Sequence, residues 1–146
     1  KAINAILKLK RRDKSKGLIV IAANVHQLHN LILPLSKHDK QRLQQYWPGF
    51  YSIIMPAKIS TPKVLTGKHN KLAVRVTMHN LVRQICNYIN TPLVSTSANI
   101  SGHLPIKNHR ECIHQFGKKV MVLPGITSFA KHPSTIIDWE NGKIIR

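Results

Sequence analysis

The sequence predicts an α/β domain built on a mixed β-sheet with flanking helices, and three observations support this prediction. Short apolar runs of strand length alternate with segments whose apolar residues recur at helical spacing. The chain closes on Asn141-Gly142, a strong two-residue hairpin signal that adds an antiparallel pair. The length of 146 residues fits one domain, and a 42% apolar composition is enough for a core.

The N-terminal half predicts three helices and two strands. Apolar residues at positions 2, 3, 6, 7 and 9 recur at the helical period, and the continuous apolar run over 18–23 is typical of a strand covered on both faces. Ser36 with Asp39 forms a capping-box pattern. We therefore expect helices over 1–9, from Asn24 to Leu31, and from Ser36 to a structural turn at Trp47-Pro48-Gly49, with strands over 18–23 and 50–55.

The second half begins with a loop, because prolines and a glycine punctuate residues 56–70. A helix over 80–89 follows, whose apolar side chains at 81, 82, 85 and 89 we expect to face the core. Asn108 with Glu111 is a second capping-box pattern and begins a helix that ends at Gly117. We expect strands over 72–76, 92–94, 120–123 and 135–139, the last pairing with residues 143–146.

The composition is strongly basic. Lys and Arg number 23 against five Asp and Glu, which gives a formal net charge of +18. This balance predicts anionic partners such as a nucleotide, RNA or a membrane surface. The few carboxylates argue against a glycosidase dyad and against a carboxylate-rich two-metal site. Asp138 and Glu140 are close in sequence, but on one terminal strand they form a poor acid/base pair.

Cysteine, histidine and hydropathy patterns exclude further classes. Cys86 and Cys112 form no CxxC pair, and we expect both to be reduced thiols, which suits a cytoplasmic protein. The nine histidines follow no zinc-binding spacing, so we expect no protein-bound metal. No apolar run reaches the roughly 20 residues of a membrane span, and we expect no membrane partner.

A basic cluster lies where the first predicted helix meets the first strand. Lys10 and Arg12 are two positions apart, and Lys16 precedes Gly17. Arginine offers a planar fork of donors to phosphate oxygens, lysine offers a mobile charge, and glycine allows close approach of the backbone. The cluster therefore predicts a phosphate site. The alternative is a solvated basic helix end that complements the helix dipole.

The segment Ser95-Thr96-Ser97-Ala98-Asn99-Ile100-Ser101-Gly102 carries four hydroxyls and one amide directly after an apolar strand. Ligands of open α/β sheets bind beyond the carboxyl ends of strands, and hydroxyls with backbone N–H groups in a tight turn bind anions. The segment is not a GxSxG nucleophile elbow. It predicts an anion-binding turn, and the alternative is an ordinary polar turn.

Two further positions are candidates for ligand contacts. Arg75 stands at the centre of an apolar strand, and a charge buried without a partner is costly. Either a bound carboxylate or phosphate is its partner, or the strand is an edge strand from which Arg75 faces water. Pro133-Ser134-Thr135 again places hydroxyls beside a strand, which is a weaker signal.

Together these motifs resemble the YrdC/TsaC family of threonylcarbamoyl-AMP synthases in its short, bacterial-type form. The resemblance spans the whole chain in the order of the family. It rests on the segments Leu9-Lys10-Arg11-Arg12, Lys16-Gly17-Leu18-Ile19, Trp47-Pro48-Gly49, Leu65-Thr66-Gly67, Leu72-Ala73-Val74-Arg75-Val76, Ser95 to Gly102, Pro133-Ser134 and Arg146.

The resemblance implies a YrdC-like twisted mixed sheet with flanking helices around a basic concave cavity. It implies that L-threonine, bicarbonate and ATP react to give threonylcarbamoyl-AMP and pyrophosphate. Mg²⁺ would be carried by the phosphates, with no structural metal in the protein. Separate transferase proteins would then move the threonylcarbamoyl group to an adenosine next to the tRNA anticodon.

The resemblance also implies roles for individual residues. The family's signature tetrad, which would be catalytic and would bind the nucleotide, corresponds to Lys10, Arg12, Ser97 and Asn99. Three further residues would contact ATP or line its pocket: Lys16, Ser95 and Arg146. Arg75 and Ser134 would hold the threonine, Arg75 through the carboxylate of the amino acid.

The chain departs from the family at its start and at two single positions. The family's upstream Pro-Thr-(acid)-x-x-Tyr-Gly-Leu motif, whose Thr contacts the amino acid, has no counterpart, and residue 1 is not Met. We therefore expect the domain over 1–146 to be N-terminally incomplete. Asp13 stands where the family often has Pro, and Pro105 stands where some members have a hydroxyl.

Two other functions compete with this interpretation. A charge of +18 would support a non-catalytic module that binds double-stranded RNA or tRNA, although no RRM, KH or OB motif is present. A carbamoyl-transfer module of hydrogenase maturation would share the fold. The zinc-binding CxxC pairs that normally accompany that module are absent from this sequence.

Overall fold

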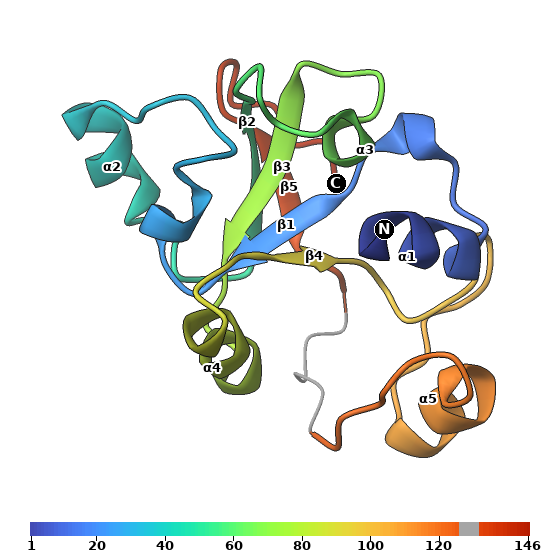
Figure 1. Cartoon of the computed structure of the whole chain (residues 1–146). Coiled ribbons are helices and arrows are strands. Elements are labelled where there is room, and N and C mark those ends of the chain that lie inside the picture. The colour runs from blue at the N-terminus through green and yellow to red at the C-terminus, as the bar shows by residue number, and fades with distance from the viewer. Residues whose placement is uncertain (126–131) are drawn as a thin grey trace.

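The computed structural model describes residues 1–125 and 132–146 and shows a twisted mixed sheet with helices around it (Figure 1). The strands are β1 (Ile19–Ala22), β2 (Tyr51–Pro56), β3 (Lys71–Val76), β4 (Leu93–Ser95) and β5 (Thr135–Asp138). Their order across the sheet is β4-β1-β3-β2-β5. β1 is parallel to β3 and β2 is parallel to β5, whereas the β1–β4 and β2–β3 pairs are antiparallel. The predicted mixed α/β class is confirmed.

Most predicted helices are confirmed. The helical segments are α1 (Ala2–Lys10), η1 (Lys14–Lys16), η2 (Val25–Leu28), α2 (Lys37–Leu43), α3 (Lys63–Thr66), α4 (Asn80–Tyr88) and α5 (His109–Phe116). The Ser36 hydroxyl and the Asp39 carboxylate form the expected reciprocal capping box of α2. The Asn108 side chain caps α5, which ends before Gly117 as predicted.

Three element predictions were wrong. The segment 56–70 contains the short helix α3, because Pro62 provides the fixed φ that suits a helix start. The helix expected from Asn24 to Leu31 is the single 3-10 turn η2, capped by Asn24. Residues 120–123 form no strand, since the N–H groups of Lys119 and Val120 bond back to Phe116 and no neighbouring strand among the described residues pairs with the segment.

Two predictions of burial also needed correction. Ile89 is 44% exposed because α4 ends at Tyr88, and Cys86 is instead the fully buried residue of that helix. β1 is not covered on both faces: Val20 and Ala22 are buried, whereas Ile19 and Ile21 are only half-buried because they line a cavity. A prediction of strand pairing was also wrong. The C-terminal residues 143–146 form a single antiparallel bridge, between Ile137 and Ile144, rather than a full strand.

Strand register separates the two faces of the sheet. Val20 pairs with Val74, Val74 with Ile53, and Ile53 with Ile137, so one row of buried apolar side chains crosses four strands. Burial of each such side chain contributes about 1.5–3 kcal/mol to folding. Because strand residues alternate between faces, Arg75, one residue further along β3, faces the opposite side. The core therefore occupies one face and leaves the other available for a site.

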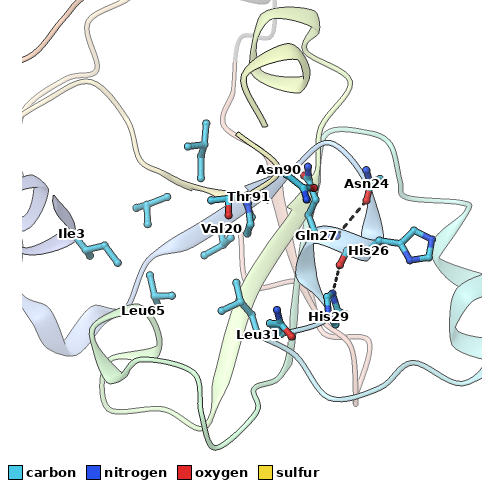
Figure 2. A pocket seen from close by; sticks show the side chains of 14 residues that line it. Ile3, Val20, Asn24, His26, Gln27, His29, Leu31, Leu65, Asn90 and Thr91 are labelled. Carbon is cyan, nitrogen blue, oxygen red and sulfur yellow. Dashed lines mark hydrogen bonds between the residues drawn. The ribbon is translucent and has the colours of Figure 1, made fainter. Parts of the chain in front are cut away.

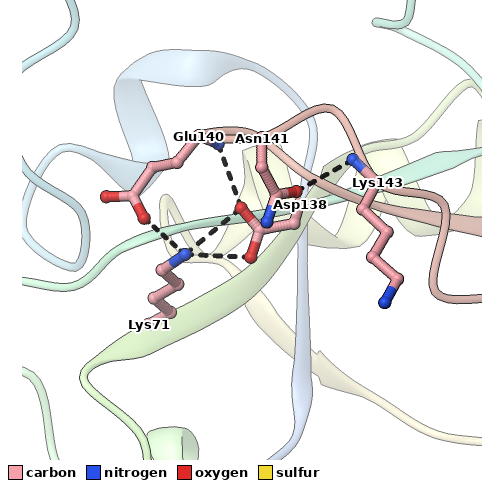
Figure 3. A network of polar contacts seen from close by, with 5 residues as sticks. All are labelled: Lys71, Asp138, Glu140, Asn141 and Lys143. Carbon is pink, nitrogen blue, oxygen red and sulfur yellow. Dashed lines mark hydrogen bonds and ion pairs between the residues drawn. The ribbon is translucent and has the colours of Figure 1, made fainter.

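A polar cluster fastens the edge strand β5 to the central strand β3 across β2 (Figure 3). The Nζ of Lys71 lies 2.9 Å from Oδ2 of Asp138 and 2.5 Å from Oε2 of Glu140. Hydrogen bonds and charge from these carboxylates raise the pKa of Lys71. The bond from Lys71 lowers the pKa of Asp138 below its usual 3.8.

Replacing Lys71 by methionine should lower the melting temperature most at neutral pH. Asp138 has a lowered pKa in the folded chain, so its stabilising effect is present above about pH 4 and is lost as pH falls further. Lys71 has a raised pKa, so its effect is lost above about pH 10.5. Thermal melts of both chains from pH 3 to 11 test this. A difference that does not change with pH would show that the cluster acts only through packing.

Candidate active site

The C-terminal end of α1 separates Lys10 from Arg12 by one residue in a left-handed conformation. The N–H of Arg12 donates to the carbonyl of Leu7 at 2.9 Å, and the N–H of Arg11 donates to that of Lys8 at 3.1 Å. These two bonds form a Schellman motif, which requires a left-handed residue directly after the helix. Arg11 adopts that conformation, with φ 50° and ψ 43°. The left-handed residue directs its two neighbours to different parts of the site.

Lys10 holds the segment that follows β4. Its Nζ donates to the backbone carbonyls of Ser97 and Asn99 at 2.5 and 2.6 Å, and to Oδ1 of Asn99 at 2.9 Å. The Ser97 hydroxyl donates to the same Oδ1 at 2.6 Å. The N–H of Ser101 returns to the Lys10 carbonyl at 2.8 Å. Three residues of the predicted tetrad are therefore in direct contact, although Lys10 and Asn99 are far apart in sequence.

Lys10 is enclosed in this arrangement, with 5% of its surface exposed. Burial lowers the pKa of Lys10, and the nearby charge of Arg12 lowers it further. Its donors are directed at oxygen atoms of the loop. The structure thus places Lys10 as the support of the hydroxyl-rich turn, and a direct contact with a nucleotide stays a prediction.

Arg12, the fourth member of the predicted tetrad, is anchored by Gly17. Nε and Nη2 of Arg12 donate to the Gly17 carbonyl at 3.2 and 3.0 Å. Gly17 has φ +63°, and a Cβ at this position would lie 2.9 Å from the carbonyl oxygen of Leu65. Only glycine fits this close crossing of two backbones. The sequence reasoning expected Gly17 to allow close approach to a ligand, whereas the group that the structure places against it is the backbone of α3.

A cavity of about 720 Å³ lies on the face of the sheet opposite the core. Its cationic and hydroxyl-bearing lining brings together six predicted site residues, from five different segments: Arg12, Arg75, Ser95, Ser97, Ser134 and Arg146. No carboxylate of the described chain lines it. The cavity is therefore suited to an anionic ligand.

Arg75 points into this cavity from the central strand β3. Its Nε donates to the Gly49 carbonyl at 2.8 Å, and its guanidinium carbon lies 4.4 Å from the centre of the Phe50 ring. Burial lowers the pKa of Arg75. Because β3 is central, the alternative of an edge strand with Arg75 in water is wrong. No carboxylate among the described residues pairs with Arg75, so its remaining donors are available to a ligand.

Ser134 and Arg146 complete the cavity beside Arg75. The Ser134 hydroxyl lies 2.9 Å from the hydroxyl of Ser52, and both residues are buried. A guanidinium nitrogen of Arg146 lies 3.4 Å from the Ser134 carbonyl. Ser52 neighbours Ile53 in β2 and therefore faces the cavity side of the sheet. The C-terminal segment thus closes one side of the cavity.

A second cavity of about 570 Å³ adjoins the first along the same face. Arg12 and Arg146 line both cavities, and Lys16 lines only the second one. The buried hydroxyl of Thr66, which also lines it, has no hydrogen-bond partner among the described residues. The two cavities together form one groove with room for a ligand longer than an amino acid.

A cavity of about 920 Å³ has a different character and lies on the core side, below β4 (Figure 2). The residues that line it include Val20, Asn24, His26 and Gln27. Gln27 is held there by bonds to the N–H of Ala23 and the carbonyl of Cys86. No Lys, Arg, Asp or Glu among the described residues lines this cavity, so it does not match an anionic ligand.

The sequence reasoning missed several residues of the site. Gly49 and Phe50 were treated as parts of a turn and a strand, but they hold the Arg75 guanidinium. Ser52 and His79 were not selected, because a serine in a strand and a histidine before a helix are common. The Trp47-Pro48-Gly49 turn is structural as expected, and the Trp47 indole N–H donates to the Tyr51 carbonyl at 2.9 Å. The function of that turn is to position Gly49.

Replacing Phe50 by leucine should weaken binding of an anionic ligand at Arg75 by about 2- to 30-fold. The ring fixes the guanidinium plane, and a cation–π contact of this kind contributes about 0.5–2 kcal/mol. Calorimetric titration with L-threonine, the ligand that the family resemblance implies for Arg75, measures the effect, and Phe50→Tyr should restore affinity. Equal affinities of the leucine variant and the natural chain would contradict the role of the ring.

The described residues contain no group of three or more His, Cys, Asp and Glu arranged to hold a metal ion. Within residues 1–125 and 132–146, no helix combines the length and apolar character needed to cross a bilayer. Both cysteines are free thiols, Cys86 being buried and Cys112 partly exposed.

The fold and the groove define an α/β protein whose cations and hydroxyls meet on one face of a mixed sheet. The whole chain, residues 1–146, matches the family "Telomere recombination", which comprises the Sua5, YciO and YrdC proteins. The chain belongs to this family.

Relatives and solved structures agree with this assignment. The chain is 44% identical over its whole length to the threonylcarbamoyl-AMP synthase of Chromobacterium violaceum, covering 76% of that protein. It is 45% identical to that of Methylobacillus flagellatus, covering 81%. The structure of P. abyssi Sua5 complexed with L-threonine superposes with a TM-score of 0.85 at 26% identity, over 94% of this chain and 41% of that one. E. coli YciO shares the fold, with a TM-score of 0.83 at 17% identity, over 99% of this chain and 72% of that one.

Proposed function

We propose that this chain is an L-threonylcarbamoyladenylate synthase, a nucleotidyltransferase that converts L-threonine, bicarbonate and ATP into threonylcarbamoyl-AMP and pyrophosphate. One observation carries the proposal. A carboxylate-free cavity joins Arg75, Ser134 and the Lys10-supported turn, in a chain that is 44% identical to a synthase of this name over its full length.

The threonine end of the cavity is the Arg75 end. The guanidinium of Arg75 is held by Gly49 and Phe50 with donors directed into the cavity, where they bind the carboxylate of the amino acid. The Ser134 hydroxyl, oriented by Ser52, lies at the same end and offers a further polar contact. P. abyssi Sua5, which shares this fold, forms a complex with L-threonine, and that complex supports this choice of amino acid.

The nucleotide occupies the part of the groove between Arg12, Arg146 and the turn over Ser95–Asn99. Backbone N–H groups and hydroxyls of this turn, held by Lys10, bind phosphate oxygens, while Arg12, Lys16 and Arg146 offset the negative charge. A carbamate oxygen attacks the α-phosphorus, and charge moves onto the departing pyrophosphate. Fixed cations stabilise that charge in the transition state. Mg²⁺ enters as the complex of ATP and is held by the phosphates.

The proposed product implies further partners. Threonylcarbamoyl-AMP carries an activated threonylcarbamoyl group, which transferase proteins would pass to an adenosine beside the tRNA anticodon. The charge of +18 favours contact with RNA phosphates. A cytoplasmic location follows from these partners and is part of the proposal.

The test is pyrophosphate release that depends on threonine and bicarbonate. The purified protein, produced at its full encoded length, should release pyrophosphate from ATP only when both co-substrates are present, and mass spectrometry should detect threonylcarbamoyl-AMP in the same samples. Matched reactions without threonine, or with D-threonine, serve as controls. Release that does not depend on threonine, or none under any condition, would contradict the proposed function.

A further inference from the structure

The reaction proposed above needs a proton acceptor, and the inference that follows rests on that function. The α-amino group of free threonine is largely an ammonium ion at neutral pH and has no lone pair with which to attack carbon. It must lose a proton before it can form a bond to the carbon of bicarbonate. A base positioned in the cavity would accelerate this step by about 100-fold or more.

The five carboxylates of the chain form helix caps or ion pairs, or lie exposed, and none lines the cavity. Asp13 and Asp39 cap the starts of η1 and α2, and Asp39 also accepts a bond from the indole N–H of Trp139 at 3.0 Å. Asp138 and Glu140 pair with Lys71. Glu111 lies on the exposed first turn of α5. None of the five lines the 720 Å³ cavity, so the base has to be another kind of side chain.

His79 is the imidazole among the residues that line this cavity. It lies at the start of α4, where its N–H donates to the Thr77 hydroxyl at 3.2 Å and its carbonyl accepts from the N–H of Arg83 at 3.0 Å. Its backbone is therefore fixed, but Nδ1 of the ring is buried and has no hydrogen-bond partner among the described residues. Buried polar atoms nearly always have a partner. Because no hydrogen bond from the described residues holds Nδ1 in place, the ring can turn about its Cβ–Cγ bond and present a nitrogen to a ligand in the cavity.

We propose that His79 accepts the proton that leaves the α-ammonium group of the bound threonine. The N–H bond breaks, its electron pair stays on the amine, and the proton moves to the imidazole. The amine then attacks the carbon of bicarbonate, and water departs to leave the N-carboxylate. One oxygen of this carbamate attacks the α-phosphorus of ATP, and pyrophosphate departs. The imidazolium returns its proton to solvent.

The charged groups around His79 favour the net release of this proton to solvent, by way of the imidazole. Arg12, Arg75 and Arg146 line the same cavity, and no described carboxylate does. An ammonium ion held among guanidinium groups is destabilised by like charges, which promotes loss of its proton. Arg75 meanwhile binds the carboxylate of the same molecule, so the amino group is held in the cavity while it is deprotonated.

The experiment compares the natural chain with His79→Gln and His79→Ala, using His114→Gln as a matched control. His114 is exposed on α5, outside the groove. Threonine affinity is measured by calorimetric titration, and turnover is measured as threonine-dependent pyrophosphate release. His79→Gln should lower kcat by about 100-fold while the Kd for threonine changes less than about 3-fold. Added imidazole should restore part of the turnover of His79→Ala, and His114→Gln should behave as the natural chain.

Every outcome of this experiment decides the point. A His79→Gln variant that binds threonine and turns over at the natural rate overturns the role of His79 and leaves the synthase function intact. Loss of threonine affinity that matches the loss of turnover, without recovery by imidazole, reduces His79 to a binding residue and also overturns the inference. Absence of threonine-dependent turnover in the natural chain overturns the proposed function, and the inference with it.

Discussion

Replacing Lys10 by methionine should lower threonylcarbamoyl-AMP formation by at least about 100-fold. The Nζ of Lys10 is the common donor to Ser97 and Asn99, so its loss releases the turn that forms one wall of the groove. Loss of a single preorganised group at a site of developing charge costs about two to three orders of magnitude in rate. Initial rates of pyrophosphate release at saturating ATP and threonine measure the effect.

Lys8→Met is the matched control for Lys10→Met. Lys8 is an exposed lysine on the last turn of the same helix, so its replacement removes the same charge without touching the turn. The control should keep nearly the full rate. If both variants lost activity equally, the effect would come from the overall positive charge and not from the contacts of Lys10.

Replacing Arg75 by methionine should raise the Kd for L-threonine by about 10- to 100-fold. Charge-assisted hydrogen bonds of the kind assigned to the carboxylate contribute about 1.5–3 kcal/mol. Arg75→Lys should recover only part of the affinity, because a lysine cannot both donate to the Gly49 carbonyl in this geometry and stack flat on Phe50. Calorimetric titration measures the binding directly, separately from catalysis.

The chain offers a closely matched control for Arg75. The guanidinium of Arg42 also lies 4.4 Å from an aromatic ring, that of Trp139, but Arg42 does not line the groove. Arg42→Met should therefore leave threonine affinity unchanged. Full affinity of Arg75→Met would place the amino acid elsewhere in the groove.

The sequence predicted the elements that local patterns define. Each predicted strand that the structure confirms is a run of apolar residues, and the helix starts at Ser36 and Asn108 follow from side chains that bond to nearby backbone groups. The errors occurred in segments whose secondary structure depends on tertiary contacts. Val120 and Met121 look like strand residues, but no neighbouring strand in the described chain is in reach, and both are exposed. The twist of the sheet was available only through the family resemblance. The strand order depends on long-range pairing and was not predicted.

The site was predictable in its residue types but not in its contacts. The Lys10-x-Arg12 spacing and the hydroxyl-rich segment stand out locally, and the structure brings Lys10, Ser97 and Asn99 together. The support of Arg75 comes from Gly49, which is 26 positions away and contributes only a carbonyl oxygen. Every residue has a backbone carbonyl, so the residue type at position 49 does not indicate that its carbonyl binds Arg75. For this reason Gly49, Phe50 and the Ser52–Ser134 pair had to come from the structure.

The left-handed conformation of Arg11 affects which substitutions the middle position of the Lys10-x-Arg12 motif can accept over evolution. The Arg11 side chain is exposed, so the folded structure constrains this position through its backbone conformation. Glycine or asparagine, which adopt positive φ readily, are interchangeable with arginine here, whereas a β-branched residue costs about 1–2 kcal/mol. Thermal melts of Arg11→Gly and Arg11→Val measure this tolerance. The fold therefore constrains the backbone conformation at this position more than the type of side chain.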